Sequence, residues 1–253
     1  MPVIQVNNYS THIQELNQEA IETVLMVHGM LSNLSMFYFS IAPILAEQFH
    51  VVMYDLKGHG MSERVLNGYD LNSMTDDLTA LMATLGLTKV HLMGHSFGGL
   101  IALKMAIRFP EKIKKLAVVE APNPNDDKTR NSMSEYSREL FNAYLDNTGE
   151  GIHLRMGKRQ VERSHQQCDF LFHQTSLKND MLLERDFFIK QEIDRIPHEA
   201  LLLYGTDSPC CEAGKHLQGR IKNSTFSLIE GGHNLPIQAP VILGNKVKAF
   251  FGK

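Results

Sequence analysis

One short segment, Gly94-His95-Ser96-Phe97-Gly98, lies where an apolar run changes into a helical pattern. The preceding run, Val90-His91-Leu92-Met93, has the length and composition of a short buried strand, and residues 100–109 favour a helix that Pro110 ends. A sharp turn between strand and helix brings the two backbones close together, which the two glycines of the segment allow. The segment therefore predicts a strand-turn-helix unit that exposes the Ser96 hydroxyl at the end of the strand.

The rest of the chain alternates apolar strands with helical segments, which is typical of an α/β protein with a mostly parallel sheet and helices on both faces. Its 253 residues suit one such domain with a sizeable core. Strands are predicted at residues 22–27, 50–54, 89–93, 115–120, 200–204 and 225–229, and short extended pieces before residue 20 are candidate edge strands. Helical spacing predicts helices at residues 36–48, 73–85, 97–109 and 239–250.

The composition changes between Pro122 and Pro197, where strand patterns stop and helical patterns with aromatic faces begin. We predict a small helical cap here, inserted after the strand that ends near Glu120, so that residues 1–121 and 197–253 form the core and residues 122–196 the cap. Two interpretations of the apolar faces remain open: they pack on the core and on each other, or they form a lid over Ser96 with a methionine-rich pocket. One such face consists of Met133, Tyr136, Leu140, Phe141 and Tyr144.

Charge and cysteine content exclude several classes of partner and favour a small-molecule substrate. The net charge is -3 with acids and bases interleaved, which provides no basic stripe for nucleic acid. No apolar run approaches the ~20 residues of a membrane span, and the first ten residues lack the pattern of a signal peptide, so we expect a cytoplasmic protein. Cys168 and the vicinal pair Cys210-Cys211 fit a reducing compartment, with a redox role for the pair as the less favoured interpretation. The sequence does not predict the oligomeric state.

Four motifs in this order resemble those of the α/β-hydrolase superfamily. They are Val-Leu-Met-Val-His-Gly-Met at 24–30, Tyr-Asp-Leu-Lys-Gly-His-Gly-Met-Ser at 54–62, the Gly-x-Ser-x-Gly segment, and Gly-Gly-His at 231–233. The resemblance covers residues 21–121 and 200–250 and leaves out the middle of the chain, where the substrate is usually selected. It implies an α/β-hydrolase sheet that carries a serine, a histidine and an acid as a catalytic triad.

A serine nucleophile needs a general base, and His233 is the candidate because it lies in the loop after the last predicted strand. The acid remains open. Asp207 is preferred because it follows the strand at 200–204, although relatives usually carry the acid one residue later, where this chain has Ser208. Glu120 is the alternative, since some members of the superfamily take the acid from that strand end, and a chain without a working acid is the third possibility.

The resemblance also implies an oxyanion hole formed by the backbone N–H groups of Met30 and Phe97. Such donors do not depend on the side chains at these positions. Structural roles, such as bracing turns, are expected for His28, His59, His95 and Asp55.

These features predict a serine hydrolase that cleaves a carboxylic ester of a small or acyl-chain substrate through an acyl-enzyme, without a cofactor or a metal. The twelve histidines are scattered, with no His-Glu-x-x-His helix, no cysteine pair at zinc spacing and no phosphate-binding loop. A dehalogenase or epoxide hydrolase is disfavoured because Ser96 stands where those enzymes would be expected to carry Asp. An acyl-thioesterase, an acyltransferase, a carbon-carbon bond hydrolase and a non-hydrolytic binding protein remain as alternatives.

Overall fold

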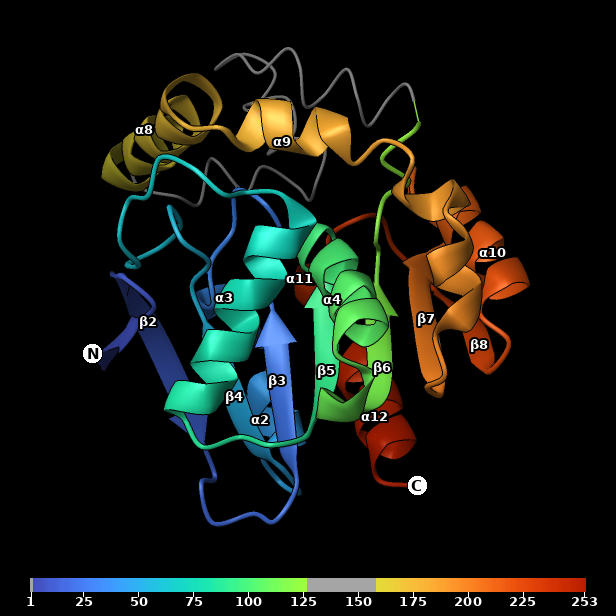
Figure 1. Ribbon diagram of the computed structural model, residues 1–253. Coiled ribbons are helices and arrows are strands. Elements are labelled where there is room, and N and C mark those ends of the chain that lie inside the picture. The colour runs from blue at the N-terminus through green and yellow to red at the C-terminus, as the bar shows by residue number, and fades with distance from the viewer. Residues whose placement is uncertain (1, 127–157) are drawn as a thin grey trace.

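The computed structural model describes residues 2–126 and 158–253 (Figure 1). Within them one eight-stranded sheet has the strand order β1-β2-β4-β3-β5-β6-β7-β8. Its first three strands in this order pair antiparallel, and all later neighbours pair parallel. The strands are β1 (Val3–Val6), β2 (Tyr9–Leu16), β3 (Thr23–Val27), β4 (His50–Tyr54), β5 (Val90–His95), β6 (Ile113–Val119), β7 (Ala200–Gly205) and β8 (Ser224–Ile229).

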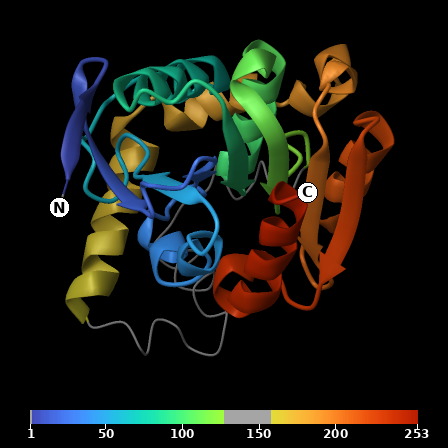
Figure 2. The same ribbon diagram turned by 90° about the horizontal axis from the view of Figure 1, so that it is seen from below.

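Helices cover both faces of the sheet, as Figure 2 shows from below. One face packs against α3 (Leu71–Thr84), α4 (Phe97–Arg108) and α10 (Cys211–Arg220), and the other against α1 (Ser35–Tyr38), α2 (Ala42–Leu45), α11 (Leu235–Gln238) and α12 (Pro240–Phe251). Every residue of the central strands β3, β4 and β5 is buried, which explains their continuous apolar character. The predicted fold class is thus confirmed, with β1 and β2 as the edge strands expected before residue 20.

The predicted helix at 36–48 is wrong in one respect, because the structure divides it into α1 and α2. Pro43 lies in the first turn of α2. A proline has no N–H group and disfavours helical backbone in the residue before it, so it suits a helix start better than a helix interior. The apolar spacing therefore predicted helical structure correctly, and the backbone restriction at Pro43 explains why the helix is divided.

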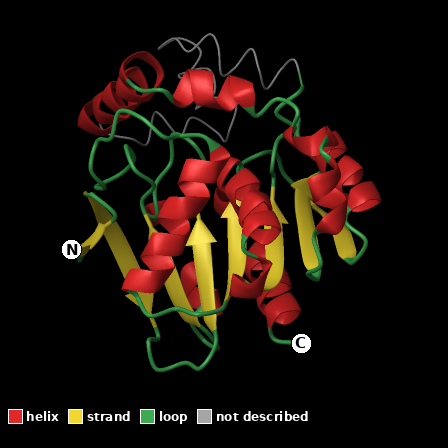
Figure 3. Ribbon diagram, viewed as in Figure 1, coloured by secondary structure: helices red, strands yellow, loops and turns green. Residues whose placement is uncertain are grey.

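Two further helices, α8 (Lys158–Gln174) and α9 (Leu177–Leu183), lie above the edge of the sheet at which the parallel strands end (Figures 1 and 3). Phe170 and Leu171 on α8 and Leu177 and Met181 on α9 are buried within the larger of the two core clusters. The chain returns to β7 through two 3-10 turns, Phe187–Ile189 and Gln191–Arg195. The predicted apolar face from Met133 to Tyr144 lies outside the described residues.

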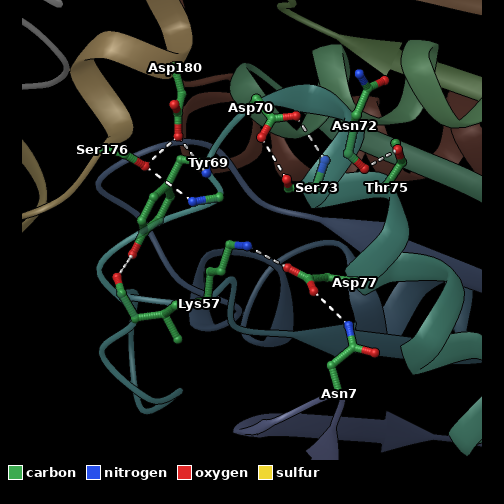
Figure 4. Close-up of polar contacts among 12 residues, drawn as sticks. Asn7, Lys57, Tyr69, Asp70, Asn72, Ser73, Thr75, Asp77, Ser176 and Asp180 are labelled. Carbon is green, nitrogen blue, oxygen red and sulfur yellow. Dashed lines mark hydrogen bonds and ion pairs between the residues drawn. The ribbon is translucent and has the colours of Figure 1, made fainter.

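The α9 segment docks on the core through backbone N–H groups (Figure 4). Tyr69 N donates to Asp180 Oδ2 at 2.8 Å, and Leu71 N, at the start of α3, donates to Glu184 Oε1 at 3.1 Å. Ser176 contributes its hydroxyl oxygen as the acceptor for Gly68 N at 3.1 Å. Because the acceptors bind main-chain groups, they fix the path of the loop as well as its distance from α9.

Beneath this loop a buried lysine forms an ion pair, also visible in Figure 4. Lys57 Nζ lies 2.7 Å from Asp77 Oδ2, and the Lys57 side chain is only 5% exposed. The ammonium group lies 6.0 Å from the ring centre of Tyr9 and 5.6 Å from that of Tyr69, within cation–π range. Asn7 donates from Nδ2 to the other Asp77 oxygen at 2.8 Å, so the carboxylate links the edge hairpin to α3.

No helix within residues 2–126 and 158–253 is both long and apolar enough to cross a membrane.

Candidate active site

Ser96 stands at the turn between β5 and α4 with a strained backbone, φ 53° and ψ -118°. Only very close packing permits this turn. A Cβ atom added to Gly94 would lie 2.1 Å from the Gly98 carbonyl oxygen, and one added to Gly98 would lie 2.1 Å from that of Val27. These separations are far below van der Waals contact, so neither position accepts a larger residue without displacement of the backbone. The predicted strand-turn-helix unit is present, and it holds Ser96 at the end of β5.

His233 connects the serine to a carboxylate. Its Nε2 atom lies 2.9 Å from Ser96 Oγ, and its Nδ1 atom lies 3.1 Å from Glu120 Oε2. The three residues come from the ends of β5, β6 and the loop after β8. Parallel strands end at the same edge of a sheet, which brings these distant parts of the sequence together.

Glu120 is fully buried and held by donors from the next strand end. Its two carboxylate oxygens accept hydrogen bonds from Gly205 N and from the Ser208 hydroxyl. Burial of a carboxylate costs desolvation free energy, and the hydrogen bonds from these donors offset that cost. Glu120 is thereby aimed at His233 and restrained from rotating.

Of the two candidate acids, the structure brings Glu120 and not Asp207 to His233. Asp207 is exposed, its Oδ2 atom accepts a hydrogen bond from Thr206 Oγ1 at 3.4 Å, and its backbone N–H donates to Gly231 O at 2.9 Å. The carboxylate beside His233 Nδ1 is that of Glu120, the alternative. The physical reason lies at the end of β7, where the chain turns so that Ser208 points inward and serves as a donor to Glu120.

The predicted oxyanion donors flank the serine. Phe97 is the first residue of α4, so its N–H has no acceptor inside the helix. The loop after β3 lies directly against the nucleophile, because a Cβ added to Gly29 would be 3.0 Å from Ser96 Cβ. Among the described residues the structure gives no hydrogen-bond acceptor for Met30 N. Neither amide therefore has an acceptor within residues 2–126 and 158–253, so both can donate to a substrate oxygen.

Backbone strain concentrates at this site. Within the described part of the chain, five residues other than glycine have positive φ, and two of them, Asn7 and Asn17, are of the type that tolerates it. The other three are Leu31 at 63°, Ser96 at 53° and Glu120 at 57°. Such conformations cost on the order of 1–3 kcal/mol each and are typical of functional sites.

Two histidines in the surrounding loops brace the backbone. His28 Nδ1 lies 2.7 Å from Gly29 O, and its Nε2 accepts from Leu56 N at 3.0 Å, so the ring is a neutral spacer between two loops. Burial lowers the pKa of His28. Burial, with the neighbouring His28 as a second cause, lowers the pKa of His59 to about 3.

His95 and Asp55 also have structural contacts. His95 Nε2 lies 2.9 Å from the carbonyl oxygen of His233, which ties the histidine loop to the elbow. Burial and the adjacent His233 lower the pKa of His95 to about 3, so it stays neutral. Asp55 accepts from Leu34 N at 2.7 Å and Met61 N at 2.8 Å and lies 2.7 Å from His12 Nδ1, which closes the loop after β4.

Cys210 is the residue at this site that the sequence did not point to. Its Sγ atom lies 3.5 Å from His233 Nδ1, on the same side of the ring as Glu120. Cys210 lies at the start of α10, three residues after Asp207, and this nearness to a candidate acid was the sequence feature that could have pointed to it. The sequence alone does not show whether the loop with Asp207 or the end of β6 lies beside His233. Cys210 also borders a surface pocket of about 480 Å³, whose other lining residues are Asn123, Asp126, Pro209, Glu212, Ala213, Lys215 and His216.

These features define a protein of the α/β hydrolase fold. A model of that family matches residues 22–171, more than half of the chain, and the chain belongs to the α/β hydrolase fold family. The match includes the elbow, Glu120 and the loop with Met30.

Relatives of similar length come from bacteria. The protein named "Putative carbamate hydrolase RutD" from Caulobacter segnis is 27% identical over 235 residues, and the alignment covers 87% of each chain. Its namesake from Pseudomonas syringae pv. syringae is 26% identical over 250 residues, with 92% of this chain and 95% of that protein covered. A fluoroacetate dehalogenase from Burkholderia is 36% identical, but over 102 residues that represent 38% of this chain and 33% of that protein.

Solved structures share the fold over the full length. The enol-lactonase from Burkholderia xenovorans LB400 has a TM-score of 0.80 and 21% identity, with 100% of both chains covered. The meta-cleavage product hydrolase from Pseudomonas fluorescens IP01 has a TM-score of 0.79 and 20% identity, with 100% of this chain and 97% of that chain covered. Together with the curated relatives, these structures support a hydrolase of the α/β fold.

Proposed function

We propose that this protein is a serine hydrolase that cleaves a carboxylic ester of a small or acyl-chain substrate through an acyl-enzyme. The observation that supports the proposal most strongly is the continuous hydrogen-bonded series from Glu120 through His233 to Ser96. A hydroxyl group becomes an effective nucleophile when an adjacent base removes its proton, and that base acts best when a carboxylate orients it. The series provides both conditions.

In the proposed mechanism, Ser96 Oγ attacks the carbonyl carbon while His233 Nε2 takes the hydroxyl proton. Glu120 holds the ring with Nδ1–H directed at its carboxylate and stabilises the imidazolium that forms. The N–H groups of Met30 and Phe97 would donate to the oxyanion. His233 then delivers the proton to the leaving oxygen, and a water molecule activated by the same nitrogen releases the acid from Ser96. This mechanism needs no cofactor.

The related acyl chemistries differ from ester hydrolysis only in the leaving group or the acceptor. An acyl-thioesterase or an acyltransferase would use the same serine, histidine and acid. Carbamate hydrolysis is a second candidate because the relatives named for it align with most of this chain, at 27% and 26% identity. Rates with matched ester, thioester and carbamate substrates that share one acyl group would separate these activities.

A non-hydrolytic binding protein is the alternative from another class. The sequence feature that supports it is the position of Asp207, one residue before the place where relatives usually carry the acid. Glu120 beside His233 removes this reason, because an acid is present at the neighbouring strand end.

We also propose that the segment 122–196 acts as a cap on a core formed by residues 1–121 and 197–253. The position of α8 and α9 above the ends of the parallel strands supports this division (Figure 1). Both helices bury apolar residues in the core, so the described part of the segment is anchored to it. A cap in this position would select the acyl group. The cytoplasmic location remains a prediction from the sequence.

The deciding experiment measures release of p-nitrophenol from acyl esters of increasing length by the wild-type protein and by Ser96→Ala. The variant should lose on the order of a thousandfold or more of the rate, as triad nucleophiles do. Mass spectrometry should also detect one covalent phosphonate adduct on the wild-type protein and none on the variant. Equal turnover by both proteins would refute the serine mechanism, and no adduct on either would favour the binding protein.

A further inference from the structure

Three different metal-ligating groups meet at the end of the sheet. They are a carboxylate oxygen of Glu120, Cys210 Sγ and His233 Nδ1, and all three atoms lie within 4.8 Å of one another. The Nδ1 atom is 3.5 Å from the sulfur and 3.1 Å from Glu120 Oε2. The hydrolytic mechanism uses Glu120 and His233 but has no step for the thiol, so the position of Cys210 needs a separate explanation.

These separations match those within a zinc site. With Zn–S near 2.3 Å and Zn–N near 2.0–2.1 Å, two ligands of a tetrahedral ion lie about 3.5 Å apart. This is the distance between Cys210 Sγ and His233 Nδ1. A thiolate with an imidazole and a carboxylate is also a set that zinc accepts, with a fourth position for water.

A cation from solvent has access to the thiol of Cys210. Cys210 is half-buried and borders the surface pocket of about 480 Å³. The same pocket is also lined by the exposed acidic residues Asp126 and Glu212. Glu120 is positioned independently of any cation by Gly205 N and the Ser208 hydroxyl.

We propose that Glu120, Cys210 and His233 form a binding site for a thiophilic divalent cation, represented by Zn²⁺, and that occupancy of this site stops hydrolysis. The binding part stands on the three ligands alone, whereas the inhibitory part rests on the proposed function.

The inhibition follows from the tautomers of His233. Hydrolysis requires Nδ1–H toward Glu120 and a lone pair on Nε2 toward Ser96. A cation bound to Nδ1 needs the lone pair of that nitrogen, so the ring proton lies on Nε2 instead, and the Cys210 thiol releases its proton to solvent. His233 Nε2 then carries a hydrogen and cannot accept the Ser96 proton.

The test is calorimetric titration of the reduced, metal-free protein with Zn²⁺ in wild type, Cys210→Ala, Cys210→Ser and the matched control Cys211→Ala. Cys211 is the adjacent thiol and is not one of the three ligands. Loss of a ligand should weaken binding by at least about tenfold, since even residues that only support a ligand have effects of 10–100-fold. We expect one bound ion in wild type and in Cys211→Ala, and weak or absent binding in both Cys210 variants.

Ester hydrolysis is then measured against the Zn²⁺ concentration, with each variant normalised to its own metal-free rate. The wild type should lose activity over the range in which it binds zinc, recover it on addition of a chelator, and require at least about tenfold more zinc when Cys210 is replaced. Equal binding or inhibition in the Cys210 variants, or an equal loss in Cys211→Ala, would overturn the site. Zinc binding through Cys210 without inhibition would overturn the inhibitory part. A protein that binds zinc through Cys210 but never hydrolyses an ester would instead refute the proposed function and retain the site.

Discussion

Glu120 and Asp180 have similar partners but different surroundings. Each carboxylate accepts one backbone N–H and one serine hydroxyl: Glu120 from Gly205 and Ser208, and Asp180 from Tyr69 and Ser176. Glu120 has a further partner, the ring of His233, which in turn contacts Ser96. Asp180 instead joins α9 to the loop before α3 (Figure 4). The same kind of carboxylate therefore anchors a segment in one region and contacts a histidine ring in the other, where the proposed mechanism uses it to orient the base.

The largest expected effect separates Glu120 from Asp207. Glu120→Gln retains the size of the side chain but can present an amide N–H to His233 Nδ1, which favours the wrong tautomer. We expect a loss of kcat on the order of 10⁴-fold, as for the equivalent change in serine proteases. Asp207→Asn, on an exposed residue, should stay close to the wild-type rate in the same ester assay. Equal effects of the two variants would show that neither carboxylate orients the base.

The next effect should be on stability alone, in the region of α9. Lys57→Met leaves the Asp77 carboxylate, which is 13% exposed, without its counter-ion. Breaking a buried pair typically costs about 3–5 kcal/mol of unfolding free energy, and we expect the lower end because Asn7 still donates to Asp77. Urea unfolding followed by circular dichroism measures this. Lys215→Met is the matched control, since its solvent-exposed pair with Glu212 should contribute little to the free energy of unfolding.

A substitution that disturbs the packing at the elbow should lower the free energy of unfolding somewhat less than Lys57→Met does. Gly98→Ala places a Cβ 2.1 Å from Val27 O and 2.6 Å from His28 O, both of them backbone atoms that cannot rotate away. Overpacking of this kind costs about 1–3 kcal/mol, and the same displacement should lower kcat because it moves Ser96. Gly219→Ala on α10 is the control: a Cβ there meets no atom within 4 Å, and alanine should stabilise the helix by about 0.5–1 kcal/mol. A higher free energy of unfolding for Gly98→Ala than for Gly219→Ala would contradict the close packing at Gly98.

Removal of Asp180 tests whether this carboxylate only anchors α9 to the core. Asp180→Ala leaves Tyr69 N and the Ser176 hydroxyl without an acceptor, at a cost of about 1–3 kcal/mol. We expect kcat with a short ester to change little, because Asp180 is not connected to His233. A kcat loss as large as that of Glu120→Gln, in a folded protein, would remove the distinction between the two carboxylates.

As the pH falls, the free energy of unfolding should decrease by about 1.4 kcal/mol per pH unit for each buried neutral histidine. His59 and His95 have pKa values lowered to about 3, mainly by burial, whereas an unfolded histidine titrates near its usual value of 6.5. Between these values the unfolded chain binds more protons, so stability is lost as the pH falls from 6.5 towards 3. His59→Asn should therefore reduce the slope of unfolding free energy against pH in this range. An unchanged slope would show that His59 is protonated in the folded protein.

Features that depend on local sequence were predictable. The strands were found within about two residues because apolar runs and turn residues mark them directly. The elbow was found because only Gly94 and Gly98 permit the contacts seen there. His233 could be identified from its place after the last strand, and the break in the predicted helix at 36–48 was visible in principle from Pro43.

The choice of acid depended on the tertiary structure. Asp207 and Glu120 both follow a strand, and the register of β6 against β7, in which Val119 lies opposite Leu203, determines which carboxylate faces His233. The thiol of Cys210 and the docking of Asp180 on the backbone of Tyr69 depend likewise on elements that are far apart in the chain. The strands, the elbow and the order of the motifs can be predicted from local sequence, since they follow from side-chain periodicity and from steric limits within a few residues. Which side chains come into contact is a property of the tertiary structure, because it depends on how separate strands align and on the direction of the turns that follow them.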